Sequence, residues 1–215
     1  MTTNTPFSWD AYNKVPIVGI IRNIPLETVL KIAKAYVAAE LFTLEVTMNT
    51  EGAAKMITRL RNEFPALNVG AGTVCTLNDF HTALDVGAQF IVTPVINEEV
   101  IKTAVSKNIP IFPGAYTPSE IHRAWVLGAS AVKIFPATQL GPQYIKDVLG
   151  PLDKIKLLPT GGVSLENIKS FFDAGAIGVG MGSSLLNKKN IQNQDFEGLK
   201  NHFLKIKSEI NEFIS

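Results

Sequence analysis

Short runs of apolar residues alternate with amphipathic stretches along the whole chain. Unbroken apolar runs of this length are typical of strands buried on both faces of a parallel sheet. The pattern predicts strands at 15–21, 42–47, 67–71, 90–92, 109–112, 131–135, 155–158 and 177–179.

The stretches between these runs carry apolar residues at helical spacing. They predict helices at 26–39, 51–63, 77–86, 98–106, 118–127, 144–149, 165–174 and 196–213. Eight strand–helix units predict an α/β protein, a single (β/α)8 TIM barrel. We expect one domain over residues 1–215, with a short N-terminal helical segment at about 6–14 and a C-terminal helix at about 194–213.

Three stretches form a weak repeat: "DVGAQFIVTP", "VLGASAVKIFP" and "DAGAIGVGMG". Each ends a helix on glycine, which commonly forms the left-handed C-terminal cap. In "YVAAELFTLEVT" Glu40 stands in the same place. Counting five residues on from each cap gives Glu45, Val92, Lys133 and Gly180. These belong to alternate strands, which in a barrel share one layer of inward side chains.

Lys133 lies inside the apolar run "ASAVKIFPA". Alternation along a strand turns Ala131, Lys133 and Phe135 inward and Val132 and Ile134 toward the helices. A desolvated amine has a lowered pKa and an available lone pair.

Such an amine attacks a ketone to form a Schiff base, and the iminium withdraws electrons from a carbon–carbon bond two atoms away. Glu45, in the same layer, could move the protons that this chemistry requires. The structural alternative is that Lys133 and Glu45 form a buried ion pair.

Two glycine-containing loops follow the seventh and eighth predicted strands, in "LLPTGGVSLENI" and "GVGMGSSL". Barrels commonly bind phosphate at this place, through backbone N–H groups near helix starts. The candidates are Gly161, Gly162, Gly182 and Ser183, and Ser164 could cap the following helix. Tight turns without a ligand are the alternative.

Other strand ends supply candidates for a small keto-acid pocket. Thr73, Pro94 and Phe135 could surround a three-carbon keto acid, although turn and core roles would explain them as well. Arg22 and Asn49 follow the first two strands and could bind a carboxylate. Helix capping or a surface role is the alternative for both, and Asn49 in particular suits an N-cap.

Composition excludes several classes of protein. A net charge of +1, from 20 basic and 19 acidic residues, gives no field that would recruit nucleic acid or an anionic membrane. Cys75 is the only cysteine, so no internal disulfide or multi-cysteine metal site is expected. The polar N-terminus lacks signal-peptide features, and no apolar run reaches the roughly 20 residues that span a bilayer. We expect a cytoplasmic protein.

Metal-dependent and serine-dependent chemistry are disfavoured. His81, His122 and His202 lie in predicted helices without metal-ligand spacing, and no serine stands in a G-x-S-x-G elbow. "VGAGTVCT" lacks the full dinucleotide-binding spacing. We therefore expect no metal and no cofactor.

Six segments together resemble a known family: "LEVTMNT", "VGAGTV", "AQFIVTP", "IPIFPGAYTPSEI", "AVKIFPA" and "LLPTGGVSLEN". From about residue 15 to 186 the chain is similar to class I aldolases of the 2-keto-3-deoxy-6-phosphogluconate (KDPG) and 4-hydroxy-2-oxoglutarate type. The resemblance implies a homotrimer of (β/α)8 barrels that acts on a small keto-acid phosphate. Such enzymes release pyruvate and glyceraldehyde 3-phosphate without metal.

The resemblance also implies roles for residues. Lys133 would be the Schiff-base lysine and Glu45 the proton-transfer residue. The remaining roles would fall to Thr73, Pro94 and Phe135 around the pyruvyl part, Thr160 at the hydroxyl-bearing carbons, and Gly161, Gly162 and Ser183 at the phosphate.

One position departs from the KDPG pattern. Where that branch usually has arginine in "LEVTLRT", this chain has Asn49. The related 6-phospho-2-dehydro-3-deoxygalactonate aldolases carry asparagine there and an arginine on the first strand, as Arg22 is here. Thr160 in "PTGG" instead matches the gluconate form.

The first expectation is therefore a KDPG aldolase, with 4-hydroxy-2-oxoglutarate as a further candidate substrate. The galactonate epimer is the alternative substrate. A non-covalent phosphate-binding isomerase or synthase, or a phosphosugar-binding protein, is the alternative from another class.

Overall fold

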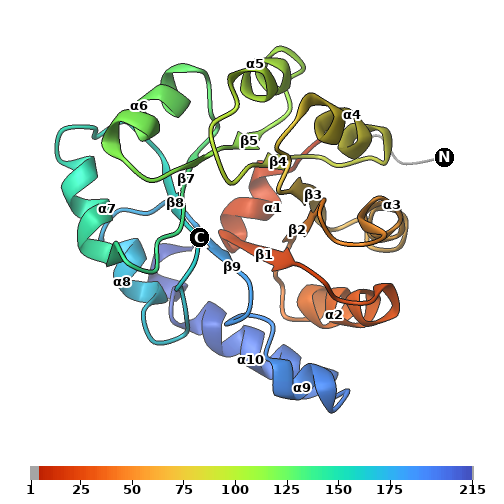
Figure 1. Cartoon of the computed structure of the whole chain (residues 1–215). Helices are drawn as coiled ribbons and strands as arrows, with labels where there is room; N and C mark the ends of the chain where they lie inside the picture. The colour runs from red at the N-terminus through yellow and green to blue at the C-terminus, as the bar shows by residue number, and fades with distance from the viewer. Residues whose placement is uncertain (1–4, 215) are drawn as a thin grey trace.

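Strands and helices alternate along the computed structural model, which describes residues 5–214, and the helices surround the strands (Figure 1). The strands are β1 (Ile17–Ile21), β2 (Thr43–Thr47), β3 (Asn68–Gly72), β4 (Ile91–Val92), β5 (Ile111–Phe112), β6 (Gly114–Ala115), β7 (Val132–Ile134), β8 (Leu157–Pro159) and β9 (Val179–Met181). The helices are α1 (Trp9–Lys14), α2 (Leu26–Ala38), α3 (Ala53–Glu63), α4 (Leu77–Asp85), α5 (Glu98–Ser106), α6 (Pro118–Val126), α7 (Gly141–Leu149), α8 (Ile168–Asp173), α9 (Lys188–Gln192) and α10 (Phe196–Ser208), followed by a 3-10 turn at Asn211–Phe213.

The prediction of a closed eight-stranded TIM barrel was wrong. The described strands form two parallel sheets, one of six strands in the order β5-β4-β3-β2-β1-β9 and one of three in the order β6-β7-β8. β5 ends where the fifth predicted strand was expected to end and pairs with β4, and after Pro113 a further strand that was not predicted, β6, pairs with β7. Proline has no N–H for a ladder, which explains the break. The segments of β8 and β9 are joined by the isolated bridge of Thr160 with Gly180 and by a hydrogen bond from the Ile177 N–H to the Leu157 carbonyl at 3.0 Å.

The helices near the C-terminus also differ from the prediction. Helix α8 begins at Ile168, because turns occupy the preceding residues and Ser164 does not cap it. Helix α9 was missed, since five residues are too few to show helical periodicity. The expected terminal helices correspond to α1 and α10, and residues 1–4 and 215 of the expected domain lie outside the described part.

The repeated helix ends have the predicted left-handed backbone. The φ angles are 92° at Gly87, 100° at Gly128 and 98° at Gly175, and Glu40 in the same slot has φ 60°. The residues five positions after these caps all lie on strands: Glu45 on β2, Val92 on β4, Lys133 on β7 and Gly180 on β9.

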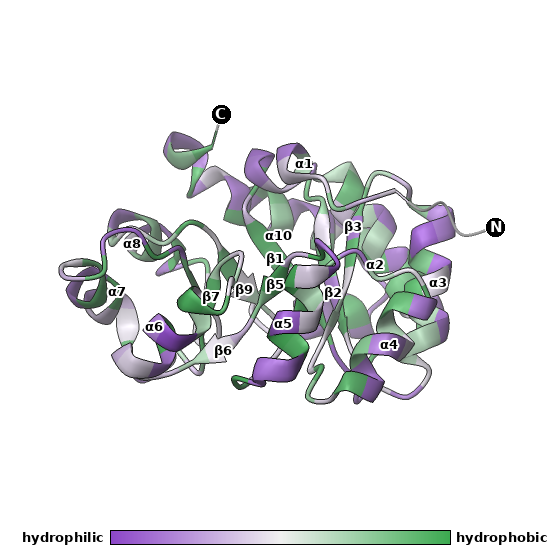
Figure 2. Ribbon diagram, turned by 90° about the horizontal axis from the view of Figure 1, so that it is seen from above, coloured by the Kyte–Doolittle hydropathy of each residue, from purple (hydrophilic) through white to green (hydrophobic). Residues whose placement is uncertain are grey.

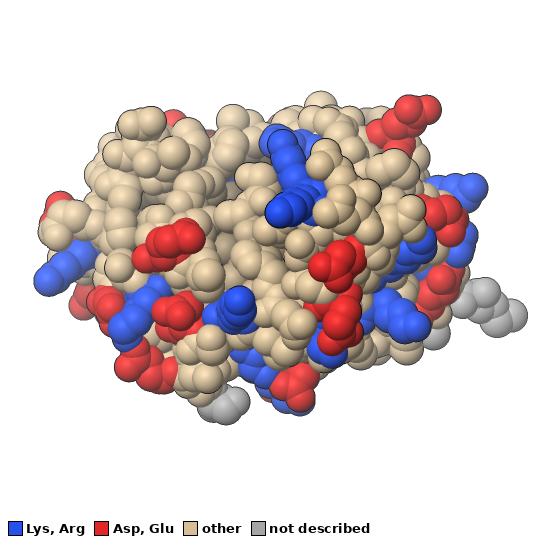
Figure 3. Space-filling view, turned by 90° about the horizontal axis from the view of Figure 1, so that it is seen from below, with Lys and Arg blue, Asp and Glu red and all other residues tan. Residues whose placement is uncertain are grey.

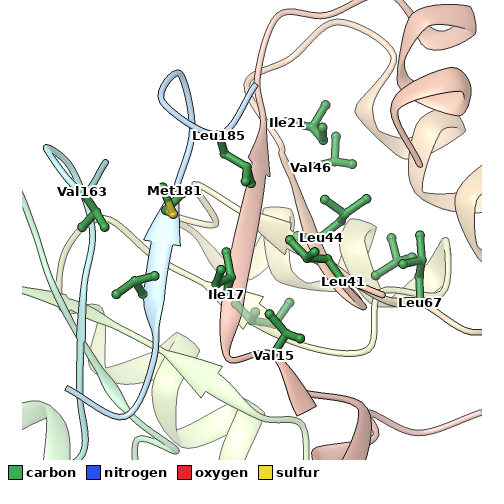
Figure 4. Packing of buried hydrophobic residues seen from close by; sticks show 14 of the residues in the cluster. Val15, Ile17, Ile21, Leu41, Leu44, Val46, Leu67, Val163, Met181 and Leu185 are labelled. Atoms are coloured by element: carbon green, nitrogen blue, oxygen red, sulfur yellow. The ribbon is translucent and has the colours of Figure 1, made fainter. Parts of the chain in front are cut away.

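Apolar side chains form two buried clusters on the two sides of the strands. The larger lies between strands and helices, and Figure 4 shows Ile17, Leu44 and Met181 from three neighbouring strands packed in it. The hydropathy colouring agrees, with hydrophobic strands inside and hydrophilic stretches on outer helical surfaces (Figure 2). The smaller cluster contains Phe90 and Phe112 from the inner strand faces, and the N-terminal Phe7 and Tyr12 pack against it.

Among residues 5–214 no helix has the length and apolar character needed to cross a membrane. The charged side chains on the face shown in Figure 3 are interspersed in sign, with no continuous band of positive charge.

Candidate active site

Lys133 and Glu45 both line a pocket at the carboxyl ends of the strands. Lys133 lies on β7 and Glu45 on β2, so the two sheets supply one residue each. Their side chains are only 6% and 2% exposed, and both line the pocket. Val132 and Ile134 belong to the larger buried cluster, between the strands and the helices. This confirms that side chains alternate along this strand as predicted.

Burial changes the proton affinity of both groups. It lowers the pKa of Lys133; the Glu45 carboxylate opposes this effect and the Arg22 guanidinium adds to it. Burial raises the pKa of Glu45, and the charge of Lys133 opposes that rise. Desolvation is the leading cause in each case, so burial shifts the pKa of the amine and that of the carboxyl group toward one another.

No ion pair of 4.0 Å or less joins Lys133 to Glu45 within residues 5–214, so the structural ion-pair alternative is not what the site contains. Lys133 Nζ instead lies 4.8 Å from the centre of the Phe135 ring. Gly72 on β3 allows the position of Glu45, because a Cβ there would come within 2.6 Å of Glu45 Oε1. The amine is therefore held close to an acid without being neutralised by direct contact.

The pocket has a volume of about 770 Å³ and collects most of the predicted site residues. Besides the lysine and glutamate, its walls include Arg22, Thr73, Pro94, Phe135, Thr160, Gly161, Gly162, Gly182 and Ser183. Asn49 is exposed and does not line the pocket; it also caps no helix, since Gly52 occupies the N-cap of α3. Of the two residues predicted to bind a carboxylate, Arg22 lines the pocket and Asn49 does not.

The glycine loop after β8 has a conformation that other residues rarely adopt. Gly161 and Gly162 have φ angles of 94° and 76°, and a Cβ on Gly162 would lie 2.8 Å from Thr138 Cα. Across the pocket, Ser184 donates a hydrogen bond to the carbonyl of Val163 at 2.5 Å. This bond fixes the two glycine-containing loops against each other, at one end of the pocket.

The pocket residues that the sequence analysis missed include three with polar side chains: Asn23, Thr47 and Lys188. Thr47 lies two residues after Glu45 on β2, so strand alternation could have placed it on the same face. Lys188 begins α9, and only the fold brings this helix beside the glycine loops. Asn23 has a left-handed backbone, φ 54°, that the sequence does not indicate.

The residues that could hold a metal are dispersed. Within the described ranges, no three His, Cys, Asp or Glu side chains gather into a possible metal site.

A model of one protein family, described as KDPG and KHG aldolase, matches residues 10–201. The chain belongs to this aldolase family. It is 35% identical over 185 residues to 2-dehydro-3-deoxy-phosphogluconate aldolase of Haemophilus influenzae, covering 86% of this chain and 87% of the relative. It is 36% identical over 175 residues to 2-dehydro-3-deoxy-6-phosphogalactonate aldolase of Escherichia coli, covering 80% and 85%.

A solved aldolase structure has the same fold. KDPG aldolase from Legionella pneumophila, with pyruvate captured at low pH as a covalent carbinolamine intermediate, superposes with a TM-score of 0.84 at 29% identity. The superposition covers 92% of this chain and 96% of that one. The aldolase family resemblance of the sequence is therefore confirmed by family, relatives and fold together.

Proposed function

We propose that the protein is a class I aldolase that cleaves 2-dehydro-3-deoxy-6-phosphogluconate to pyruvate and glyceraldehyde 3-phosphate. The observation that carries this proposal is the buried Lys133 amine, with its lowered pKa, which lines one pocket together with Glu45. The covalent carbinolamine of the Legionella relative supports the same type of chemistry.

The uncharged Lys133 nitrogen attacks the C2 carbonyl and forms a carbinolamine. Protonated Glu45 gives its proton to the departing hydroxyl, so that water leaves and an iminium remains. The Glu45 carboxylate then takes the proton of the C4 hydroxyl as the C3–C4 bond breaks. The bond's electrons move to the iminium nitrogen, giving an enamine and the aldehyde product.

The second half of the reaction restores the enzyme. Glu45 returns the proton to C3 of the enamine, which becomes the iminium of pyruvate. Addition of water to this iminium releases pyruvate and the free lysine. One carboxyl group thus serves every proton transfer, as its position beside the amine allows.

The phosphate end of the substrate is proposed to bind the two glycine loops through Gly161, Gly162, Gly182 and Ser183. These residues line one end of the pocket, and Lys188 beside them adds a positive charge. Thr73, Pro94 and Phe135 are proposed to surround the pyruvyl part, and Thr160 to contact the hydroxyl-bearing carbons.

The carboxylate role is proposed for Arg22, which lines the pocket, and not for Asn49, which does not. Arg22→Ala is expected to raise KM for the keto acid about 10- to 100-fold with little change in kcat, because a charged hydrogen bond to the carboxylate is lost. Steady-state kinetics measure both constants. Arg59→Ala, which removes an exposed arginine paired with Glu63, is the matched control. An unchanged KM in Arg22→Ala would assign the carboxylate to another group.

The gluconate epimer is proposed as the better substrate because Thr160 lines the pocket. Cleavage rates on the purified gluconate and galactonate epimers, and on 4-hydroxy-2-oxoglutarate, test this choice. A clear preference for the galactonate epimer would overturn it. Cleavage of none of the three, with isomerisation of a phosphosugar instead, would favour the non-covalent alternative.

We also propose a homotrimer, as the family resemblance implies. Exposed apolar side chains lie in or just before α5 (Val95 and Val105) and α6 (Tyr116 and Val126), which suits burial against another copy. Sedimentation velocity is expected to give three times the monomer mass of 23.4 kDa, and Val126→Asp to shift the distribution toward smaller species. A monomer at micromolar concentration in the unsubstituted protein would contradict the trimer.

A further inference from the structure

Two buried threonines pair beneath the loop that carries Arg22. Thr47, the last residue of β2, and Thr50, in the turn that follows, are 3% and 5% exposed. Their Oγ1 atoms lie 2.9 Å apart. The Thr50 N–H also donates to the Thr47 carbonyl at 2.9 Å, so this turn is closed by backbone and side chains together.

The same pair is tied to the β1–α2 loop. The backbone N–H of Asn23 donates to Thr50 Oγ1 at 3.1 Å, across 27 positions of the sequence. Asn23 has φ 54°, a left-handed conformation that persists only where surrounding contacts impose it. Because Arg22 immediately precedes Asn23, this hydrogen bond helps fix the backbone from which the Arg22 side chain enters the pocket.

Either hydroxyl of this pair can be the donor, and one of the two directions leaves Thr47 able to bind a ligand. The Asn23 N–H uses one acceptor site of Thr50 Oγ1, and Thr47 is the other side-chain partner of Thr50 in the described part of the chain. If Thr50 donates its hydroxyl hydrogen to Thr47, the hydrogen of Thr47 is available to another acceptor. Thr47 lines the pocket on the same strand face as Glu45, two residues nearer to the strand's end.

We propose that Thr47 binds the carboxylate of the keto acid together with Arg22, and that Thr50 is the positioning residue that orients both. The chain of hydrogen bonds runs from Asn23 N–H to Thr50, from Thr50 to Thr47, and from Thr47 to a carboxylate oxygen. Arg22 supplies charge and Thr47 supplies a directed donor, which places the C2 carbonyl beside Lys133. This inference rests on the proposed aldolase function.

Steady-state kinetics on the purified enzyme test the proposal. Thr47→Val, which replaces the hydroxyl by a methyl group of similar size, is expected to raise KM for KDPG about 10- to 100-fold and to change kcat less than threefold. Thr50→Val is expected to raise KM about 3- to 30-fold, and Thr50→Ser, which keeps the hydroxyl, to restore it. Thr43→Val removes a hydroxyl equally buried at the other end of β2 and is the matched control.

A second measurement tests whether Thr47 contributes specifically to binding of the carboxylate. Borohydride reduction traps a Schiff base with pyruvate and also with acetone, which has the ketone but no carboxylate. Thr47→Val is expected to need about tenfold more pyruvate for half-maximal trapping, with the acetone dependence unchanged. Equal losses with both ketones, or an unchanged KM for KDPG, would overturn the assignment of Thr47.

The outcome for the unsubstituted enzyme separates the two proposals. If it neither cleaves KDPG nor is trapped by pyruvate, the aldolase proposal fails and the threonine inference fails with it. If it does both while Thr47→Val and Thr50→Val behave as Thr43→Val does, only the threonine inference is overturned.

Discussion

Replacing Lys133 with alanine is expected to abolish KDPG cleavage, a loss on the order of 10⁵-fold or more. Without the amine no iminium forms, and the electrons of the C3–C4 bond have no acceptor. Arg22, Thr73 and the glycine loops remain, so substrate still binds but is not cleaved. The measurement is pyruvate release by the purified variant, with circular dichroism to show that it is folded.

Borohydride reduction with pyruvate locates the reacting nitrogen. The expected product is a single covalent adduct on Lys133 in the unsubstituted protein and none in Lys133→Ala. Lys156→Ala, which removes an exposed lysine just before β8, is the control. This variant should form the same pyruvate adduct on Lys133 as the unsubstituted protein. An adduct that survives in Lys133→Ala, or cleavage that survives there, would show that this lysine is not the nucleophile.

The lowered pKa of Lys133 also sets the pH dependence of trapping. The amine reacts only when uncharged, so the trapping rate falls as the pH drops through its pKa. Because burial lowers that pKa below the ordinary lysine value, the fall should occur at lower pH than for an exposed lysine.

Glu45→Gln is expected to reduce kcat by about 10²–10⁴-fold, the usual contribution of general acid–base catalysis. Glutamine has nearly the same shape and keeps the space beside Gly72 filled, but it cannot exchange protons at the reacting atoms. KM should change little, because Glu45 is not proposed to hold either charged end of the substrate.

Two observations separate this role from a structural one. The variant should still form the reduced adduct on Lys133, more slowly, since the amine is intact. Glu51→Gln, an exposed residue of the β2–α3 connection, should leave kcat unchanged. A kcat within threefold of the original in Glu45→Gln would require another proton carrier, and water held by Thr47 or Thr73 would be the next candidate.

Much of the site followed from local sequence patterns. The spacing from helix caps at Glu40 and Gly128 placed Glu45 and Lys133 on inward faces, because a cap fixes where the next strand begins and alternation fixes where each side chain points. The glycine pair at Gly161 was recognisable for a similar reason, since its backbone conformation excludes other residues.

Strand pairing and loop positions required the three-dimensional structure. The ladder depends on hydrogen bonds between distant residues, and Pro113 interrupts it at a point where the apolar pattern continues. Asn49 and Thr47 are two residues apart, yet the turn after β2 exposes one and buries the other in the pocket. Lys188 reaches the glycine loops only because α9 folds back beside them.

The sequence by itself determined the alternation of strands and helices, apart from β6 and α9, and the direction in which Lys133 and Glu45 point. These depend on periodicity and capping within a few consecutive residues. The tertiary structure alone decided that the strands form two sheets, that Arg22 lines the pocket without Asn49, and that a threonine pair supports it. Each of these depends on contacts between residues far apart in the chain, whose free energies no local pattern encodes.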